Sequence, residues 1–482
     1  ATGGERNTAD SWEYTTQINN ENGTLYHGSW NIDENTWYNS IGSIPSGKYF
    51  VQVQDNSGCI VGDTVEIVDQ AQDTYYVSTT GSNSNSGTSK TDAFASIATA
   101  VDFACTNDTI ILLDGTYYED SLTVEKNLVI GSEFILDADT NHIAATIIDG
   151  NNDGWIMAWQ AGSSSWADTT TNQLVGLTLQ NGAQTSNSST YGGALAVFNS
   201  KALKISNVRF LNNSSRYGGG ARFHSSSYVT MDKVLFKDNS AYYGGALYAS
   251  TGYYLMNNTE FTGNSCSGDA SVVRLDAYTL SSRNVNVHHN ISSSTSYAVL
   301  LYVYNLSSNA IMRDWKIQNN ISANNTLLLY GLSNKQLLIE NALITDNITT
   351  NAHPGLNIQY NSGKISIVNS TIANNSSVSS NSSDVAPLYV TYSGNNGVVN
   401  VLNTIVQTDA SYSIYDPSNS TNTLNINNSF ISGDQSAIVL QSNTTLNYNA
   451  SNLATGLYFT DAANGDYSLS SVSTLLGAGA VS

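Results

Sequence analysis

The residues best placed to do chemistry recur with the spacing of an internal repeat. Counting in steps of 26 residues, Ala196, Arg222, Tyr248 and Arg274 fall at equivalent positions. If successive repeats are stacked strands about 4.8 Å apart, the two arginines lie about 10 Å apart with Tyr248 between them. A guanidinium can bind a carboxylate through two parallel hydrogen bonds. This column therefore predicts a candidate binding site for an anionic sugar.

A second column lies two residues further along the chain and faces the same way. It contains Phe198, His224, Ser250 and Asp276, so His224 and Asp276 would complete a polar patch with the arginines. Glycoside hydrolysis usually needs two carboxyl groups about 5–10 Å apart, whereas this patch has one. A solvated face with cation–π contacts between the arginines and Tyr248 is the simpler interpretation. We therefore predict no catalytic residue.

Two oxygen-rich segments are weak candidates for calcium binding. Asp137 and Asp139 lie in DADTN, and Asp149 and Asp153 lie in DGNNDG. Alternating carboxylates and amides resemble calcium loops, but both segments lack the later glutamate of an EF-hand. Aspartate and asparagine are also common in tight turns. The sequence predicts no cofactor, with Ca²⁺ as the weak alternative.

The repeat that sets these columns is clearest where it begins with Tyr-Gly-Gly. Three such stretches start at Tyr191, Tyr217 and Tyr243. Glycine clusters can cradle phosphates, but a phosphate loop requires a lysine after the last glycine, and none follows here. We therefore expect the glycines to form a corner of a coil.

Each repeat ends in an apolar residue followed, three positions later, by asparagine. Between these points lie short runs with period-two hydrophobic alternation, such as LKISNVRF and VTMDKVLF, which predict strands. Strands separated by turns at intervals of 25–33 residues indicate a β-solenoid. In such a coil the asparagines could turn inward and form a stacked amide ladder, which would comprise Asn213, Asn239, Asn264, Asn290, Asn320, Asn347 and Asn375.

The segment before the repeats predicts an end cap and a fold family. Ser96 could N-cap a short amphipathic helix within residues 92–106, which would cover the first coil. The segment YYVSTTGSNSNSGTSKTDAFASIATAVDFACTNDTIILLDGTYY resembles the start of right-handed parallel β-helix proteins of the pectin-lyase-like superfamily. The Gly-Gly-Ala and Phe-x-x-Asn units resemble repeats of chlamydial polymorphic outer-membrane proteins. The resemblance implies an all-β fold with three-stranded coils over residues 73–482.

Residues 1–72 lie outside the repeat and predict a separate module. Alternation in KYFVQVQD and DTVEIV, with turns at SGK and NSG, favours a small immunoglobulin-like β-sandwich. The stretch from Gly47 to Tyr49 and that from Asp55 to Cys59 resemble the repeats of Bacteroidetes gliding-type surface adhesins. The chain should therefore contain a β-sandwich followed by a β-helix.

Composition restricts the partners. The net charge is −21, from 38 acidic and 17 basic residues, which disfavours nucleic acid binding. Three cysteines distant in sequence predict buried thiols rather than a disulfide scaffold or zinc site. No apolar run is long enough to span a membrane. Asn-x-Ser/Thr sequons, including those at Asn187, Asn290, Asn320 and Asn347, make glycosylation a further expectation.

Function is the least constrained of these predictions, because the β-helix fold supports many activities. We expect a secreted protein of the extracellular cell surface with a structural or adhesive role, which could self-associate into a filament or surface layer or bind other surface proteins. Two alternatives stay open. One is a polysaccharide lyase or glycoside hydrolase, and the other is a non-catalytic glycan-binding protein. Both would use the face that carries Arg222, His224, Tyr248, Arg274 and Asp276.

Overall fold

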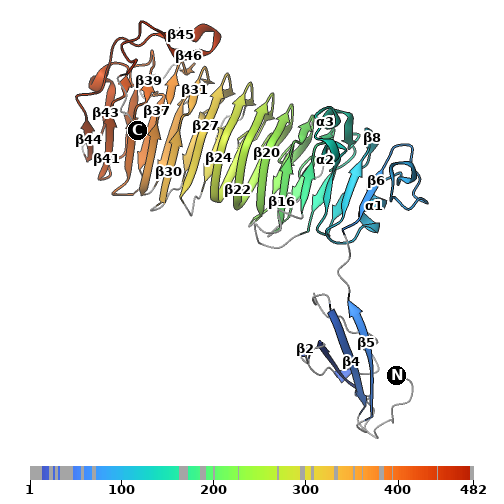
Figure 1. The fold of residues 1–482 in the computed structure, drawn as a ribbon. Coiled ribbons are helices and arrows are strands. Elements are labelled where there is room, and N and C mark those ends of the chain that lie inside the picture. Colours follow the sequence, from blue (N-terminus) through green and yellow to red (C-terminus); the bar gives the residue numbers. More distant parts are fainter. Residues whose placement is uncertain are drawn as a thin grey trace. The chain divides into compact units, whose positions relative to one another are not determined.

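The computed structural model divides the chain into two compact units, Ala1–Gln72 and Asp73–Ser482. Figure 1 shows the strands of the second unit stacked side by side along one axis. The residues that the structure describes are 14–20, 25–27, 31–32, 47–55, 59–67, 72–161, 172–184, 191–198, 201–225, 227–268, 271–293, 299–304, 309–330, 335–350, 353–360, 362–378, 385–392, 394–441 and 443–477.

The described strands of the first unit form one antiparallel sheet. Strand β4 pairs with both β1 and β5, while β1 also pairs with β2 and β3. The strands are β1 (Tyr14–Asn20), β2 (Leu25–His27), β3 (Asn31–Ile32), β4 (Gly47–Asp55) and β5 (Ile60–Ile67). A sandwich needs a second packed sheet, so the immunoglobulin-like module and its relation to surface adhesins stay predictions.

The second unit is a parallel β-solenoid. The strands that open most of its turns form ladder 1, in which each strand hydrogen bonds to its counterpart one turn away. Ladder 1 comprises β6 (Thr74–Val77), β7 (Thr109–Leu112), β10 (Val129–Ser132), β13 (Gln173–Val175), β16 (Ala202–Ser206), β20 (Tyr228–Lys237), β22 (Leu247–Thr262), β24 (Val273–His288), β27 (Ala310–Gln318), β30 (Lys335–Glu340), β34 (Gly363–Val368), β38 (Val398–Leu402), β41 (Asn422–Asn427) and β44 (Thr444–Tyr448).

Ladder 2 follows after a sharp corner. Strands β20, β22, β24 and β27 run through this corner and contribute their C-terminal residues to ladder 2. Its other strands are β8 (Gly115–Tyr118), β11 (Thr146–Asp149), β14 (Thr178–Gln180), β17 (Arg209–Leu211), β31 (Leu343–Thr345), β35 (Thr371–Ala373), β39 (Ile405–Val406) and β42 (Phe430–Ile431).

Ladder 3 carries the candidate functional face. Strands β22 and β24 contribute their first residues to it, 247–249 and 273–276. Its other strands are β9 (Leu122–Val124), β12 (Met157–Trp159), β15 (Leu195–Val197), β19 (Ala221–Phe223), β26 (Val299–Tyr304), β29 (Asn325–Tyr330), β33 (Leu356–Tyr360), β37 (Leu388–Tyr392), β40 (Ile414–Asp416) and β43 (Ile438–Leu440).

A separate, short sheet lies between ladders 2 and 3 in chain order. It comprises β18 (Ser214–Tyr217), β21 (Ser240–Tyr243), β23 (Ser265–Cys266), β25 (Ile291–Ser292), β28 (Ile321–Ser322), β32 (Ile348–Thr349) and β36 (Ser376–Ser377). The parallel solenoid agrees with the predicted all-β architecture. Its handedness and the three-stranded form of its coils stay predictions.

Buried apolar side chains from strands of all three ladders form one continuous core. Equivalent residues of successive turns stack on each other. Phe210, Phe236 and Phe261 lie with ring centroids 4.7 and 4.9 Å apart and nearly parallel planes. This stacking follows from the register, because ladder 2 pairs these residues directly. Repeated burial of identical side chains is the main source of stability in such a coil.

The predicted asparagines form the expected column at the corner after ladder 2. The Asn264 side chain is fully buried, and its Nδ2 donates to Asn290 Oδ1 at 3.0 Å and to the Phe236 carbonyl at 2.9 Å. Its Oδ1 accepts from Asn239 Nδ2 at 2.9 Å. The same amide-to-amide contact joins each neighbouring pair from Asn213 to Asn375. A glycan could not reach the sequons at Asn290, Asn320 and Asn347, because these amides are buried. Asn187 lies outside the described residues.

The residue before each ladder asparagine makes the sharp bend. These residues adopt the left-handed conformation that asparagine, aspartate and glycine tolerate best. They are Asn212 (φ 55°), Asp238 (φ 56°), Gly263 (φ 66°), His289 (φ 55°), Asn319 (φ 55°), Asp346 (φ 58°) and Asn374 (φ 51°).

A short helix, α1 (Ile97–Phe103), packs against the first strands of the solenoid through Ile97, Ala100 and Val101. The Ser96 hydroxyl accepts a hydrogen bond from the backbone N–H of Thr99, as expected for an N-cap. Glu119 accepts from the first backbone N–H groups of the helix, and Lys126 Nζ donates to its last carbonyl groups. Charges of these signs at the two helix ends also complement its dipole.

Smaller elements complete the described structure. A 3₁₀ turn spans Lys90–Asp92, two short helices, α2 (Phe134–Asp137) and α3 (Asn141–Ala145), lie between β10 and β11, and further 3₁₀ turns span Asp434–Ala437 and Ala462–Asn464. Strands β45 (Phe459–Asp461) and β46 (Asp466–Leu469) form an antiparallel pair near the end of the chain. Within the described residues, no helix is long and apolar enough to cross a membrane.

Candidate functional site

The outward positions of ladder 3 form one column of side chains along the solenoid. Register pairs Ala196 with Arg222, Arg222 with Tyr248, and Tyr248 with Arg274. Their strand neighbours, such as Leu247 and Ala249, point into the core. We call Arg222, Tyr248 and Arg274 the Arg–Tyr stack. The structure therefore brings these three predicted residues together.

Both arginines contact the same aromatic ring. The guanidinium carbon of Arg222 lies 4.3 Å from the centroid of the Tyr248 ring, and that of Arg274 lies 5.0 Å from it. Arg222 also lies 5.3 Å from the Tyr217 ring. Cation–π attraction therefore holds two positive charges within one small area, although like charges repel.

Burial distinguishes the two arginines. Arg222 is 9% exposed, and this burial lowers the pKa of its guanidinium from the ordinary value. Arg274 is only partly buried. The stack is therefore not the fully solvated face of the simpler interpretation, because Arg222 is enclosed by Tyr217 and Tyr248. Arg274 is the better placed of the two for contact with a ligand.

The second predicted column is realised only in part. The Phe198 and His224 rings stack, with centroids 4.9 Å apart. At the position of Ser250 and Asp276 the register between β22 and β24 shifts, so these two residues are not direct ladder partners. Asp276 instead interacts electrostatically with Tyr254, a buried phenol. Burial and the negative charge of Asp276 raise the pKa of Tyr254, whereas the positive charge of Arg222 lowers it. Tyr254 belongs to ladder 1, where it pairs with Val229 and Leu280, so counting along the outward column of ladder 3 does not reach it.

Aromatic residues extend the Arg–Tyr stack on its N-terminal side. Tyr217 and Tyr243, which open two of the repeats, stack at 4.8 Å. Trp155 and Tyr191 lie 4.3 Å apart with nearly parallel planes, and Tyr191 also contacts Phe198. All five side chains are partly exposed. Partly exposed aromatic rings beside arginines offer a ligand both apolar and positively charged contacts.

The same outward column continues toward the C-terminus with a different composition. Register pairs Asn357 with Tyr389 and Tyr389 with Tyr415, whose rings stack at 5.7 Å. The His353 ring lies 3.5 Å from that of Tyr389, and burial lowers the pKa of His353 to about 4. Asn357 is 1% exposed and donates to Asn325 Oδ1 at 2.8 Å. Charge in the column is thus concentrated at the Arg–Tyr stack.

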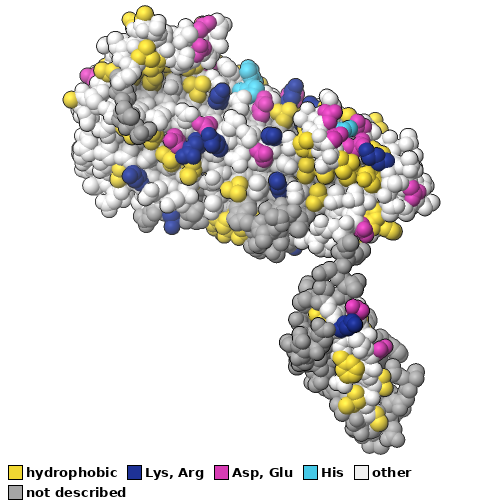
Figure 2. All heavy atoms as spheres, in the orientation of Figure 1, with side chains coloured by type: hydrophobic (Ala, Val, Ile, Leu, Met, Phe, Trp, Pro, Cys, Tyr) yellow, Lys and Arg dark blue, Asp and Glu magenta, His cyan; other side chains and the backbone are white. Residues whose placement is uncertain are grey.

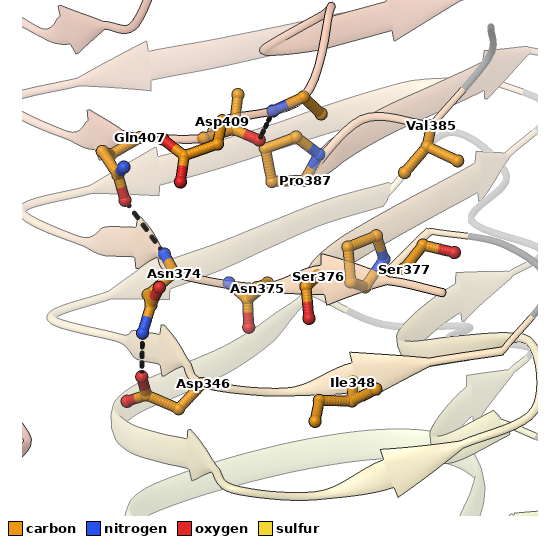
Figure 3. A pocket seen from close by; sticks show the side chains of 13 residues that line it. Asp346, Ile348, Asn374, Asn375, Ser376, Ser377, Val385, Pro387, Gln407 and Asp409 are labelled. Atoms are coloured by element: carbon orange, nitrogen blue, oxygen red, sulfur yellow. Dashed lines mark hydrogen bonds between the residues drawn. The ribbon is translucent and has the colours of Figure 1, made fainter. Parts of the chain in front are cut away.

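A cavity of 490 Å³ lies at the corner of three successive turns. Its wall is polar along one side, where the Asn374 side-chain amide donates to Asp346 Oδ1 at 2.5 Å. The backbone N–H of Asn374 donates to Gln407 Oε1 at 3.0 Å. Figure 3 shows these residues following one another from turn to turn, with Asp409 beside them. The remaining lining includes apolar and hydroxyl side chains: Ile348, Pro354, Ser376, Ser377, Val385, Pro387, Thr408 and Ala410.

This cavity does not have the features of a carboxylate pair that is ready for acid–base catalysis. The Asp346 carboxylate already accepts from Asn374 and from the Tyr467 hydroxyl, each at 2.5 Å. Two protein donors therefore already occupy acceptor positions of this carboxylate, about half of its capacity. The cavity therefore ranks behind the Arg–Tyr stack as a functional site.

The four aspartates predicted as weak calcium ligands either accept hydrogen bonds from protein donors or lie apart from one another. Asp149 is 7% exposed, and its carboxylate accepts from the Asn151 backbone and from the Gln180 and Asn181 side chains. Asp153 is exposed, and its carboxylate is absent from that cluster of contacts.

Asp137 and Asp139 each accept a backbone N–H two residues later, which is turn chemistry. Within the described residues, the group whose ligand atoms converge is a different one, Asp114, Glu133 and His142. These residues are far apart in the sequence and only the coil brings them together.

The surface of the solenoid carries few charges. Figure 2 shows scattered basic and acidic side chains on a surface that is mostly neither charged nor apolar. The chain has 11% charged residues. Against this background, two arginines on one ring are a local concentration of positive charge in a protein whose net charge is −21.

Comparisons with known proteins give similarity to solved structures only. The sequence matches no protein-family model and no curated protein. Among solved structures, the chain is similar to the pectate lyase Pel9A (13% identity, 86% of this chain and 93% of the lyase, TM-score 0.31). It is also similar to a rhamnogalacturonan lyase (11%, 80% and 87%, TM-score 0.27) and to the Yersinia enterocolitica family 28 exopolygalacturonase (8%, 94% and 96%, TM-score 0.20).

These structural neighbours are polysaccharide lyases and a hydrolase. TM-scores this low carry no conclusion about the activity of this chain, so its function must follow from its own residues. The predicted relation to polymorphic outer-membrane proteins stays a prediction.

Proposed function

We propose that the outward face of ladder 3 binds an acidic polysaccharide, with the polysaccharide chain lying along the solenoid. The observation that carries this proposal is the Arg–Tyr stack, in which Arg222 and Arg274 lie 4.3 and 5.0 Å from one tyrosine ring. A partly exposed arginine can bind a sugar carboxylate in bidentate geometry, and the partly exposed rings of Tyr191, Tyr217 and Tyr243 add aromatic surface for contact with sugar rings.

The length of the face suits a polymer better than a small molecule. Ladder 3 repeats its outward positions at about 4.8 Å per turn, and aromatic side chains recur along it at Tyr248, Tyr389 and Tyr415. A polymer could contact several turns at once, so weak contacts add up. Affinity should therefore increase with oligosaccharide length.

Binding is favoured over catalysis. In the described part of the patch, Asp276 is the carboxylate nearest to the arginines in sequence, whereas hydrolysis needs a pair of carboxyl groups. The His224 ring is stacked on Phe198 rather than held by a carboxylate. Cleavage of the polysaccharide is the second candidate function, and the experiment below detects it.

The test compares binding of polygalacturonate with binding of its methyl-esterified form, which has the same backbone without the charge. Calorimetry should show that the wild type prefers the charged polymer, and that Arg274→Ala weakens binding about tenfold, the loss of one charge-assisted contact. Arg274→Lys should restore it only in part, because lysine lacks the planar fork.

The matched control is Arg283→Ala, since Arg283 is an exposed arginine that pairs with Asp314 on another face. Equal affinities for wild type and Arg274→Ala, or binding to neither polymer, would contradict the proposal. Product analysis in the same samples distinguishes binding from turnover. Cleavage lost in Arg274→Ala would establish the lyase or hydrolase alternative.

We further propose that the protein acts outside the cell, where acidic polysaccharides are accessible. The charge-poor surface rich in asparagine, serine and threonine supports this location. Self-association and adhesion to other surface proteins stay proposals of the same kind. Light scattering at increasing protein concentration tests self-association, and an unchanged monomer mass would exclude a filament.

A further inference from the structure

The helices α2 and α3 belong to an excursion that leaves the coil after β10 and rejoins it at β11. The excursion packs against the solenoid through Phe134. The Phe134 side chain lies so close to Gly176 that a Cβ added to this glycine would be 2.7 Å from it. Gly176 has φ 68°, which favours glycine and leaves room for this contact. His142 lies in α3, and Glu133 immediately precedes α2.

Three potential metal ligands converge where this excursion meets the coil. Asp114 comes from the turn between β7 and β8, Glu133 from the end of β10, and His142 from α3. One ligand atom of each lies within 4.8 Å of those of the other two. His142 Nδ1 is 2.7 Å from Asp114 Oδ1. Imidazole nitrogen and carboxylate oxygen are both ligands that Zn²⁺ takes in proteins.

Each of these three ligands also contacts a neighbouring side chain. His142 Nε2, on the far side of the ring, is 3.3 Å from Asp137 Oδ2, so a carboxylate orients the imidazole. The hydroxyl of buried Thr146 donates to Asp114 Oδ1 at 3.2 Å. Lys90 Nζ donates to Glu133 Oε1 at 2.5 Å, which leaves the other oxygen of Glu133 for a further contact.

We propose that Asp114, Glu133 and His142 bind a divalent transition metal ion of the Zn²⁺ class. Three protein ligands with water in the fourth position would complete a tetrahedral site. The imidazole argues against Ca²⁺, which takes six to eight oxygen ligands. The bound ion ties α3 to two turns of the solenoid and thereby anchors the excursion.

The competing arrangement uses protons instead of metal. A protonated His142 and Lys90 could neutralise the same carboxylates through the ion pairs already described. The two arrangements differ in whether the protein binds added Zn²⁺, since a protonated imidazole does not coordinate a metal. Binding of Zn²⁺ is therefore the decisive measurement.

The full chain, freed of metal by chelation and dialysis, is titrated with Zn²⁺ alone by calorimetry at neutral pH. We expect one equivalent to bind and the thermal unfolding midpoint to rise on binding. His142→Ala should abolish this event, and Asp137→Asn should weaken it about tenfold, as is usual for a residue that orients a ligand. Asp114→Asn, which keeps the side-chain shape, should also remove it.

Asp139→Asn is the matched control, because Asp139 lies in the same excursion, outside the ligand set, and should leave Zn²⁺ affinity unchanged. Circular dichroism shows whether each variant retains the wild-type fold. No Zn²⁺ binding by the wild type, or equal binding by wild type and a folded Asp114→Asn or His142→Ala variant, overturns the proposal.

Discussion

Buried amides at the corner after ladder 2 are the most regular feature at the scale of single residues. Each asparagine from Asn239 to Asn347 donates to the next amide and accepts from the previous one, so a long column of polar groups is satisfied inside the protein. A buried amide without partners would be destabilising, whereas a continuous ladder removes that cost at every turn. Removal of one member should therefore affect its neighbours on both sides.

Asn264→Ala should lower the free energy of unfolding by about 2–4 kcal/mol, because the backbone N–H and one Nδ2–H of Asn239 lose their buried acceptor and the Phe236 carbonyl loses a donor. Asn286→Ala is the control, since Asn286 is a partly exposed residue of strand β24 that is not part of the asparagine ladder. Denaturant unfolding measures both. A loss for Asn264→Ala no larger than for Asn286→Ala would show that the ladder contributes little.

His353 should make stability depend on pH. Burial lowers its folded-state pKa to about 4, whereas an unfolded histidine titrates near 6.5. The unfolded chain therefore binds more protons between these values, and acidification from about pH 6.5 toward 4 should reduce stability by at most about 1.4 kcal/mol per pH unit. His353→Phe keeps an aromatic ring against Tyr389 and removes the titration. Thermal unfolding of both proteins at pH 7 and 5 tests this, and an equal loss in both would refute it.

At the scale of elements, the corner before ladder 3 depends on glycines because backbones approach closely there. A Cβ on Gly193 would lie 2.2 Å from the Gly219 carbonyl oxygen, and one on Gly219 would lie 2.2 Å from that of Gly245. Both obstacles are backbone atoms, which cannot move without disturbing the ladder. The repeated glycines thus serve packing, and the arginine of the next strand rather than the glycine loop is the candidate for binding.

Gly219→Ala should destabilise the protein by roughly 3 kcal/mol through overpacking. Gly154→Ala is a suitable control, because a Cβ there would approach only the Asp120 side chain, at 3.4 Å. Thermal unfolding of the two variants gives the comparison. If Gly219→Ala were as stable as the control, the corner would be more adaptable than its geometry indicates.

At the scale of the whole molecule, the chain folds back along its own coil near its C-terminus. Tyr467, in β46, is 6% exposed and donates to Asp346, which lies 121 residues earlier. This contact attaches the β45–β46 pair to the side of the solenoid (Figure 1). Burial and the hydrogen bond to Asp346 raise the pKa of Tyr467 above its ordinary value, so the phenol stays protonated as the donor at neutral pH.

Tyr467→Phe should therefore release the returning segment without unfolding the coil. Hydrogen exchange of residues 456–476 should accelerate about tenfold or more, the effect of losing a hydrogen bond to a charged group, while the ladders keep their protection. Tyr458→Phe is the control, as Tyr458 is 55% exposed. Unchanged exchange in Tyr467→Phe would mean that other contacts hold the segment.

Local patterns in the sequence were enough to determine the repeat, the solenoid and the outward column of Arg222, Tyr248 and Arg274. This was possible because a solenoid has a regular register, so spacing along the chain translates directly into position along the axis. The inward asparagines could be identified for the same reason. Their spacing varies with loop length, but their place after the apolar residue does not.

Only the tertiary structure decided what depends on irregularities and on distant segments. The register shift in β22 and β24 moved Asp276 away from its predicted partner, and burial of Arg222 against two tyrosines could not be read from spacing. Asp114, Glu133 and His142 come from three separate segments, and Tyr467 reaches a turn far from its own. Such contacts depend on how loops and excursions pack against the coil, which no repeat period encodes.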